Sequence, residues 1–295
     1  MRYVFAFLLS TLLCYSCLVT KSSVEISDST ITPQEIQPNL SNVLRETSGL
    51  IAWDGGLWTI NDGGSAPAIF KMNATDGSIQ DSIHLTGVSN QDWESITHDE
   101  DYIYVGEFGN NKGLRKNLLI YKISKVQVKN KQPLTIDSIA FHYPEQKSFP
   151  DSYDHNFDAE AFISFGDSLY VFTKNWLDQR CVIYTLPKQP GNYPAYRKAS
   201  FDTQGIVTGA TTNNKEDVVT LIGYNYDKVT RGFSPFAWTF SNFKGTNIFS
   251  GSARRNNLES KRQVESIAWS KKGEYWITAE KASGGKASLY RLKLD

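Results

Sequence analysis

Apolar and polar residues alternate along most of the chain in short runs that are rich in aromatic and β-branched side chains. This period of two predicts β-strands, because successive side chains of a strand point to opposite faces. The runs recur in five similar units, which begin at Glu46, Glu94, Glu160, Val207 and Glu265. Each unit opens with a small or acidic residue before an apolar run, and continues through a turn into an aromatic-rich strand and a third strand. Such repetition at about 40–50 residues is typical of the four-stranded blades of a β-propeller.

A fourth strand follows in the first four units, at residues 79–85, 136–143, 196–201 and 248–253. The fifth unit has no room for one, because the chain ends at Asp295. An open sheet edge leaves backbone groups unpaired, so we expect residues 24–36 to supply the missing strand. The prediction is an all-β fold, a five-bladed β-propeller closed by an N-terminal strand. The alternatives are a six-bladed ring and a β-sandwich. A six-bladed ring would need two blades between Glu94 and Glu160, and this interval is too short for them. A β-sandwich does not require the same motif to recur at the start of each unit.

The N-terminus predicts export. Arg2 precedes an apolar stretch that is too short to span a bilayer as a helix. The Ser-Cys pair that follows resembles a bacterial lipobox, which implies a signal peptide at residues 1–16 and a lipid on Cys17. Residues 17–42 would then be a lipid-anchored tether and closing strand, and residues 43–295 the propeller domain. The alternative is an ordinary signal peptide, and under either interpretation the protein reaches the bacterial cell envelope.

Charge and cysteine content narrow the possible partners. The chain carries 31 basic and 31 acidic residues and no long run of either sign, so it offers no obvious basic face for nucleic acid. Cys181 would be the one thiol of the lipidated mature domain, which cannot form an internal disulfide alone. We expect a monomer whose partner is a small ligand or a protein, with the membrane contacted through the lipid on Cys17.

The repeat sequences resemble a family of uncharacterised exported bacterial β-propeller lipoproteins. The resemblance is carried by Glu46-Thr47-Ser48-Gly49-Leu50, Asn61-Asp62-Gly63-Gly64, Asp92-Trp93-Glu94-Ser95-Ile96, Gly106-Glu107-Phe108-Gly109, Asp158-Ala159-Glu160-Ala161-Phe162 and Lys174-Asn175-Trp176. More distantly, an acid at the start of most blades is similar to the calcium-dependent apyrase propellers and to the phytase-like or esterase-like propellers. These resemblances imply a propeller, and the distant ones concern pattern alone.

Strand pairing predicts where polar side chains gather. The second strand of a blade runs antiparallel to the first, so its end returns to the face where the first began. Two concentric polar rings should therefore share one face of the propeller. The inner ring would contain Glu46, Glu94, Glu160, Thr208 and Glu265. The outer ring and its rim would contain the predicted ligand-binding residues Asp62, Asp92, Glu107, Asp158, Lys174, Asn175, Trp176, Glu280 and Lys281.

Several carboxylates near one axis need compensation for their charge, and three interpretations stay open. In the first, the glutamates accept backbone hydrogen bonds and lock neighbouring blades together. In the second, Glu46, Glu94, Glu160 and Glu265 bind Ca²⁺, which prefers six to eight oxygen ligands. In the third, one carboxylate of a hydrolase is a general base or activates a metal-bound water, and Lys174, Lys281 or Arg45 binds the anionic substrate. No nucleophile elbow, histidine-rich metal motif or phosphate loop occurs. The sequence therefore favours a non-catalytic binding module with an acid-lined axial site and Ca²⁺ as the expected ion. The alternatives are a Ca²⁺-dependent hydrolase of phosphate esters or other small anions and a protein-interaction scaffold.

Overall fold

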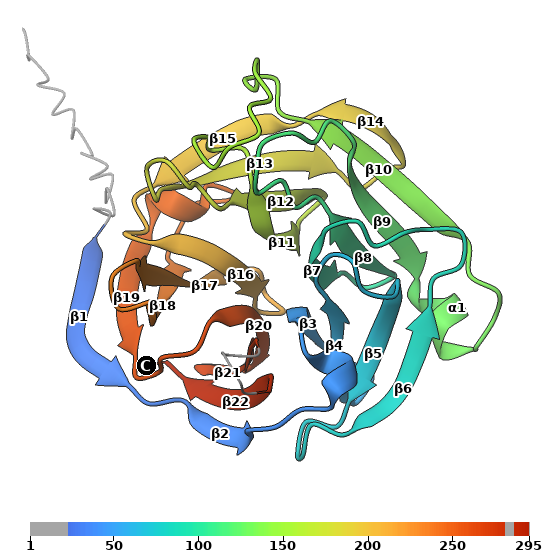
Figure 1. Cartoon of the computed structure of the whole chain (residues 1–295), viewed down its shortest axis with the longest axis horizontal. Helices are drawn as coiled ribbons and strands as arrows, with labels where there is room; N and C mark the ends of the chain where they lie inside the picture. The colour runs from blue at the N-terminus through green and yellow to red at the C-terminus, as the bar shows by residue number, and fades with distance from the viewer. Residues whose placement is uncertain (1–22, 281–285, 295) are drawn as a thin grey trace, which may run out of the picture.

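The structure is a computed structural model that describes residues 23–280 and 286–294. Its strands form five small sheets arranged around a common axis, so the predicted five-bladed propeller is confirmed (Figure 1). The innermost strands are β3 (Thr47–Trp53), β7 (Trp93–His98), β11 (Ala159–Phe165), β16 (Ile206–Thr212) and β20 (Val264–Lys271). Each of them contacts the innermost strands of the two adjacent blades, and these contacts complete a circle.

The first three blades follow the predicted order. The first adds β4 (Gly56–Asn61), β5 (Ala68–Met72) and β6 (Ile79–His84) to β3. The second adds β8 (Tyr102–Glu107), β9 (Leu118–Ser124) and β10 (Ile136–His142) to β7, with the short helix α1 (Lys125–Lys129) after β9. The third adds β12 (Ser168–Thr173), β13 (Cys181–Pro187) and β15 (Tyr196–Phe201) to β11. The predicted fourth strands at 79–85, 136–143 and 196–201 therefore match β6, β10 and β15 closely.

The fourth blade corrects one predicted strand. It contains β16, β17 (Val218–Asp227), β18 (Gly232–Ser241) and β19 (Ser252–Leu258). Residues 248–253 were expected to form its fourth strand, but Ile248–Ser250 is a 3₁₀ helix and the strand lies later in the chain. The apolar side chain of Ile248 suggested a strand, yet it is buried from this short helix against the core between the third and fourth blades.

The fifth blade is closed by the N-terminal segment, as predicted. It contains β20, β21 (Glu274–Ala279) and β22 (Ser288–Lys293), and β2 (Gln34–Gln37) pairs antiparallel with β22 as the fourth strand. The preceding strand β1 (Val24–Ile31) does not join this sheet, although it lies within the segment expected to do so. It pairs in parallel with β19 of the fourth blade. Strands β1 and β2 therefore bridge two adjacent blades (Figure 1).

Two of the five sheets carry a fifth strand, which pairs in parallel with an outer strand. On the fourth blade it is β1, which lies in the segment expected to form a strand. On the second blade it is β14 (Gly191–Pro194), which the hydrophobic pattern did not predict because its residues are mostly exposed. Between the blades lie clusters of buried aromatic and aliphatic side chains, which hold the ring together. None of the helices in the described part of the chain is long and apolar enough to cross a membrane.

Candidate functional site

Polar residues gather at one end of the propeller axis because of how the two inner strands of each blade pair. The amides of Asp62, Lys174 and Glu280, which follow the second strands, donate to carbonyls that precede the first strands, each at 2.9 Å. The acceptors are Glu46, Asp158 and Gln263. The start of the inner strand and the end of its neighbour therefore share a face, as the sequence predicted. We call this end of the axis the mouth, defined by Asp62, Asp92, Glu94, Asp158, Glu160, Lys174, Glu265 and Glu280.

The structure revises the alignment of the first unit. The carbonyl of Asp92 accepts from Gly109 in the second blade, just as the carbonyl of Glu46 accepts from Asp62 in the first. Glu46 is therefore equivalent to Asp92 at the rim and not to Glu94 in the inner ring. Ser48 takes the inner-ring position of this blade, and its hydroxyl donates to the carbonyl of Glu94. The half-buried Glu46 lies near Arg45, with 3.6 Å between Oε1 and Nε.

The three inner-ring glutamates are held where the inner strands depart from regular pairing. The register of β7, β11 and β20 shifts at Glu94, Glu160 and Glu265, so each glutamate is the extra residue of a β-bulge. All three are buried, with exposed fractions of 3%, 6% and 5%. One carboxylate oxygen of each is buried and accepts no hydrogen bond from the described residues. If the glutamates held neighbouring blades together, we would expect these oxygens to accept hydrogen bonds. Their lack of such bonds argues against that role.

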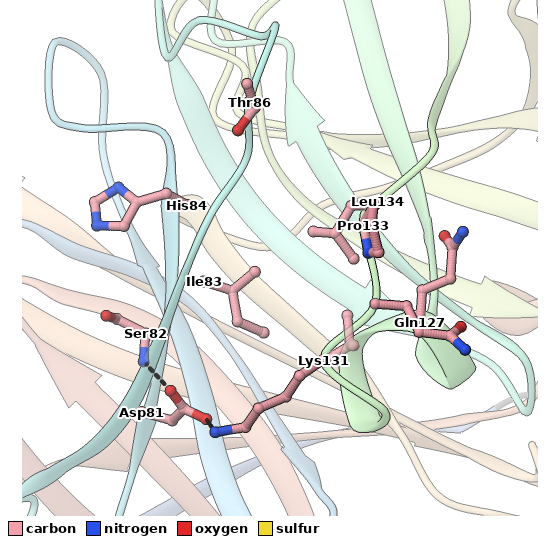
Figure 2. A pocket seen from close by; sticks show the side chains of 11 residues that line it. Asp81, Ser82, Ile83, His84, Thr86, Gln127, Lys131, Pro133 and Leu134 are labelled. Carbon is pink, nitrogen blue, oxygen red and sulfur yellow. Dashed lines mark hydrogen bonds and ion pairs between the residues drawn. The ribbon is translucent and has the colours of Figure 1, made fainter.

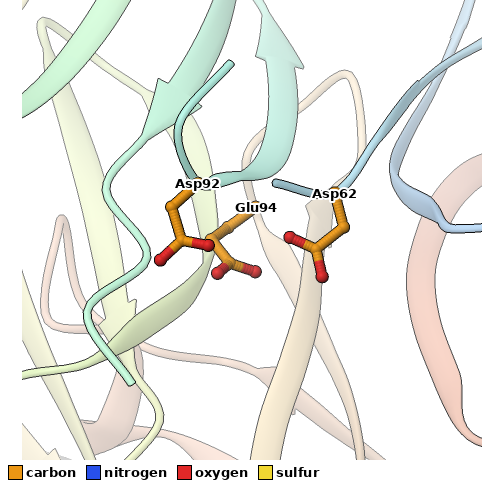
Figure 3. Close-up of side chains that lie close together, drawn as sticks. All are labelled: Asp62, Asp92 and Glu94. Carbon is orange, nitrogen blue, oxygen red and sulfur yellow. The ribbon is translucent and has the colours of Figure 1, made fainter. Parts of the chain in front are cut away.

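Three carboxylates of the mouth lie close enough to share one ion. Asp62, Asp92 and Glu94 each place an oxygen within 4.8 Å of the oxygens of the other two. Figure 3 shows them facing one another, with Asp62 contributed by the first blade and Asp92 and Glu94 by the second. We call this set the acidic triad. The triad includes the buried Glu94 Oε1, which has no hydrogen-bond partner in the described chain.

The loops that carry the triad are tied together by Asn90. Its side-chain amide donates to the carbonyls of Asn61 and Asp62, both at 3.0 Å, and its Oδ1 accepts from the amide of Trp93 at 3.0 Å. Asn90 is buried. Because one side chain bonds both loops, it sets the distance between the Asp62 loop and the start of β7.

Two glycines leave room for the carboxylates to converge. A Cβ on Gly109 would collide with Glu94 Oε1 and lie 2.5 Å from Asp92 Oδ2. A Cβ on Gly63 would lie 2.7 Å from Asp92 Oδ1. Both distances are well inside van der Waals contact, so any other residue at these positions would push the acids apart.

Glu107 has a structural role at the mouth, and it depends on Arg115, which the sequence analysis did not identify. Arg115 Nη2 donates to Glu107 Oε1 at 2.6 Å, while the two Glu107 oxygens accept from the amides of Gln91 and Asp92. Arg115 Nη1 lies 3.9 Å from Asp92 Oδ2. Glu107 is therefore already satisfied and positions the loop that carries Asp92. No repeat position marks Arg115, since it comes from the loop after β8.

The other side of the mouth is compensated by Lys174. This buried lysine donates to Glu160 Oε1 and lies 4.7 Å from the ring centre of Trp176. Trp176 Nε1 donates at 2.9 Å to Asp158 Oδ2, and the other oxygen of Asp158 accepts from the amide of Asn110 at 2.7 Å. Asp158 and Trp176 are thus engaged with the protein itself. Trp176 also packs edge-on against Tyr153, with ring centres 5.0 Å apart.

The remaining predicted positions differ in their surroundings. Asn175 is buried, and its amide donates to Asp178 in the turn that follows, so it shapes the loop. Glu280 is half-buried at the mouth. Lys281 and the predicted lipidation site Cys17 lie outside the described residues, as does the predicted signal peptide.

Burial and mutual repulsion raise the pKa of most acids in the mouth. Burial, reinforced by Asp62, raises the pKa of Asp92 to about 7 and that of Glu94 well above its usual range. Burial also raises the pKa of Glu160 to about 8, although Lys174 opposes the shift. For Lys174 itself, burial would lower the pKa, but Glu160 and other nearby groups raise it well above normal, so it stays charged. The mouth therefore contains more carboxyl groups than its own cations can hold in the charged form.

A separate hollow of about 490 Å³ lies on the outer rim, between β6 and the segment around α1 (Figure 2). An ion pair spans it, with 3.7 Å between Lys131 Nζ and Asp81 Oδ2. Both side chains are substantially exposed, so the pair adds little stability. The acids of the mouth take no part in this hollow.

No protein-family model and no curated protein sequence matches the chain. Among solved structures, the catalytic domain of a GH62 α-L-arabinofuranosidase from Coprinopsis cinerea superposes with a TM-score of 0.51 at 9% identity, over 89% of this chain and 97% of that one. The PQQ-bound aldose sugar dehydrogenase from Streptomyces coelicolor gives a TM-score of 0.48 at 14% identity, over 90% of this chain and 98% of that one. At 9% identity the first of these resemblances concerns the fold alone, and it agrees with the propeller described above.

Proposed function

We propose that this protein is a binding module of the β-propeller type that holds a Ca²⁺ ion on the acidic triad and presents it at the mouth to a ligand. The observation that carries the proposal is the convergence of Asp62, Asp92 and Glu94 around one point, with Glu94 Oε1 buried and without a hydrogen-bond partner in the described chain. A buried carboxylate oxygen without a donor is costly, and a cation would remove that cost.

Calcium fits this arrangement better than a transition metal does. All three side chains offer oxygen, which hard cations prefer, whereas Zn²⁺ sites usually include histidine or cysteine. Ca²⁺ takes six to eight oxygens in flexible geometry, so three carboxylates leave coordination positions for water or for oxygens of a ligand. Gly63 and Gly109 leave the room that these carboxylates need to converge.

Thermal melting under calcium titration tests the proposal. A ligand at about 100 times its Kd stabilises the folded state by about 2.7 kcal/mol, which corresponds to roughly 5–10 °C in Tm for a domain of this size. We expect this shift in the wild type and its loss in Glu94→Gln and Asp62→Asn. Asp137→Asn removes an exposed carboxylate from β10 and serves as the matched control, with an unchanged response. A wild-type Tm that neither Ca²⁺ nor a chelator moves would overturn the proposal.

The surroundings of Lys174 favour a binding module over a hydrolase. In the hydrolase alternative, Lys174, Lys281 or Arg45 would bind an anionic substrate. Of these, Lys174 is buried and already paired with Glu160, so an anion would have to displace Glu160 from it. Turnover of phosphate or carboxylate esters that is lost in Glu94→Gln would reverse this ranking.

We further propose that the protein is exported and anchored in the cell envelope by a lipid on Cys17. The support is the sequence of the first 17 residues, with one basic residue, an apolar stretch and a Ser-Cys pair. Metabolic labelling with a fatty acid should mark the wild type and leave Cys17→Ala unlabelled. Equal labelling of both proteins would exclude Cys17 as the attachment site.

A further inference from the structure

A groove of about 780 Å³ lies beside the fourth blade, apart from the acidic triad. Strand β19 and the segment that follows it form one wall, and β18 with the end of β17 forms the other. Phe233, Pro235 and Leu258 give the groove an apolar part. Its polar part differs from that of the mouth, because basic and amide groups outnumber acids there.

Arg255 lines this groove as a buried cation that lacks a carboxylate. Its exposed fraction is 7%, and no aspartate or glutamate of the described chain forms an ion pair with it. The guanidinium stacks on Phe236, with 4.6 Å between its carbon Cζ and the ring centre, and Nη1 donates to Asn257 Oδ1. Nε is buried and has no hydrogen-bond partner in the described residues. A guanidinium in this state is expensive to keep in the folded protein unless an anion accompanies it.

The neighbours of Arg255 supply further donors for an anion. The amides of Asn225 and Asn257 and the ammonium of the exposed Lys261 line the same groove. The one acidic residue of the lining is Glu259, which is exposed and accepts a hydrogen bond from Thr32. Arginine suits such a site because its planar fork of donors matches a carboxylate or a phosphate.

We propose that this groove is a second binding site, which takes an organic anion with an apolar body: its carboxylate or phosphate neutralises Arg255, and its body packs on Phe233 and Leu258. The site is independent of the proposed calcium site, since none of its residues belongs to the mouth. It would give the propeller two recognition surfaces of opposite charge preference.

Calorimetric titration at constant ionic strength tests this proposal on the wild-type protein. The probes are benzoate, phenyl phosphate and neutral benzamide, which share an aromatic body. We expect saturable binding of at least one anion, about tenfold or more tighter than that of benzamide, because hydrogen bonds to charged groups contribute about 1.5–3 kcal/mol. Preference for benzoate or for phenyl phosphate then identifies the headgroup. Equal affinity for the anions and benzamide, or binding of none of them, would refute the proposal.

Variants of the protein test whether the anion binds at Arg255. Arg255→Met should weaken the anion about tenfold or more. Arg254→Met should not, because Arg254 precedes Arg255 on β19 and its side chain points to the opposite face of the sheet, with 3.7 Å between its Nε and Glu25 Oε1. Arg255→Lys keeps the charge without the fork and should fall between the two. Binding in Glu94→Gln should equal that of the wild type, which separates this site from the triad; loss of binding there would mean that the anion binds at the mouth.

Discussion

The two sides of the mouth compensate the charge of their carboxylates in different ways. On the side of the third blade, buried Glu160 meets buried Lys174, and Asp158 is satisfied by an indole and backbone amides. On the side of the first two blades, Asp62, Asp92 and Glu94 converge, while Arg115 pairs with Glu107 at 2.6 Å and lies 3.9 Å from Asp92. The protein thus compensates one side with a buried lysine and the other only in part with Arg115, and this is the side on which we propose an external cation.

This difference explains why counting acids does not locate the ion site. All three inner-ring glutamates are buried at equivalent bulges. Glu94 and Glu160 differ in the group that each one faces. Glu94 converges with Asp62, which follows the second strand of the preceding blade, whereas Glu160 pairs with Lys174, which follows the second strand of its own blade. A carboxylate facing a carboxylate attracts a cation, whereas a carboxylate facing an ammonium forms an ion pair.

The largest expected effect follows from removing the internal cation. Lys174→Met leaves Glu160 buried without its partner, and breaking a buried pair in this way costs about 3–5 kcal/mol. Chemical denaturation should therefore show a free energy of unfolding that is lower by this amount. Lys174→Met combined with Glu160→Gln should recover much of the loss, because the double variant no longer buries an uncompensated carboxylate. A double variant as unstable as Lys174→Met alone would mean that the lysine acts through packing.

The second prediction disturbs the geometry of the acidic triad without changing its charge. Gly109→Ala places a methyl group against Glu94 and Asp92, so the triad must open. We expect a loss of about 2–3 kcal/mol in stability, as for other overpacked sites, together with loss of the calcium-induced rise in Tm. Gly87→Ala is the matched control, since a Cβ there meets nothing within 4 Å, although its positive φ adds some backbone strain. An unchanged calcium response in Gly109→Ala would contradict the geometry proposed for the triad.

The sequence predicted the ring and its acidic face but not the division between the two sides. Repeated strands and the missing last strand were enough for the blade number and its closure, because both follow from the hydrophobic period and from backbone pairing. The alignment of Glu46 with the inner ring was wrong, since Ser48 takes that position with a hydroxyl in place of a carboxylate. Arg115 lies in a loop that is not part of the repeated pattern, so the periodicity of the sequence could not predict its contact with Glu107.

A third prediction concerns His98 at the end of the inner strand β7, where Lys125 contacts its neutral imidazole. Lys125 Nζ donates to His98 Nδ1 at 2.8 Å, next to Asp99. Burial, helped by Lys125, lowers the pKa of His98 from 6.5 to about 4. Below pH 6.5 the unfolded chain therefore binds a proton that the folded protein does not, so stability falls as the pH drops toward 4. We expect this histidine to account for a loss of about 2.5 kcal/mol over that window. The difference in unfolding free energy between wild type and His98→Gln, measured along the pH series, isolates it from other titrating groups, and a constant difference would contradict the prediction.

The smallest expected effect is the sharpest test of the comparison. Glu265 is buried at the same kind of bulge as Glu94, and it too has an oxygen without a hydrogen-bond partner in the described chain. It lies outside the acidic triad, however, and Lys174 partly offsets its charge. Glu265→Gln should therefore leave the apparent calcium affinity within about twofold of the wild type, whereas Glu94→Gln should weaken it about tenfold or more, as expected for loss of a charged ligand. Calorimetry on the two variants under the same conditions makes the comparison directly. If both weakened calcium equally, the whole ring of glutamates would act as one site, and the mouth would have no separate sides.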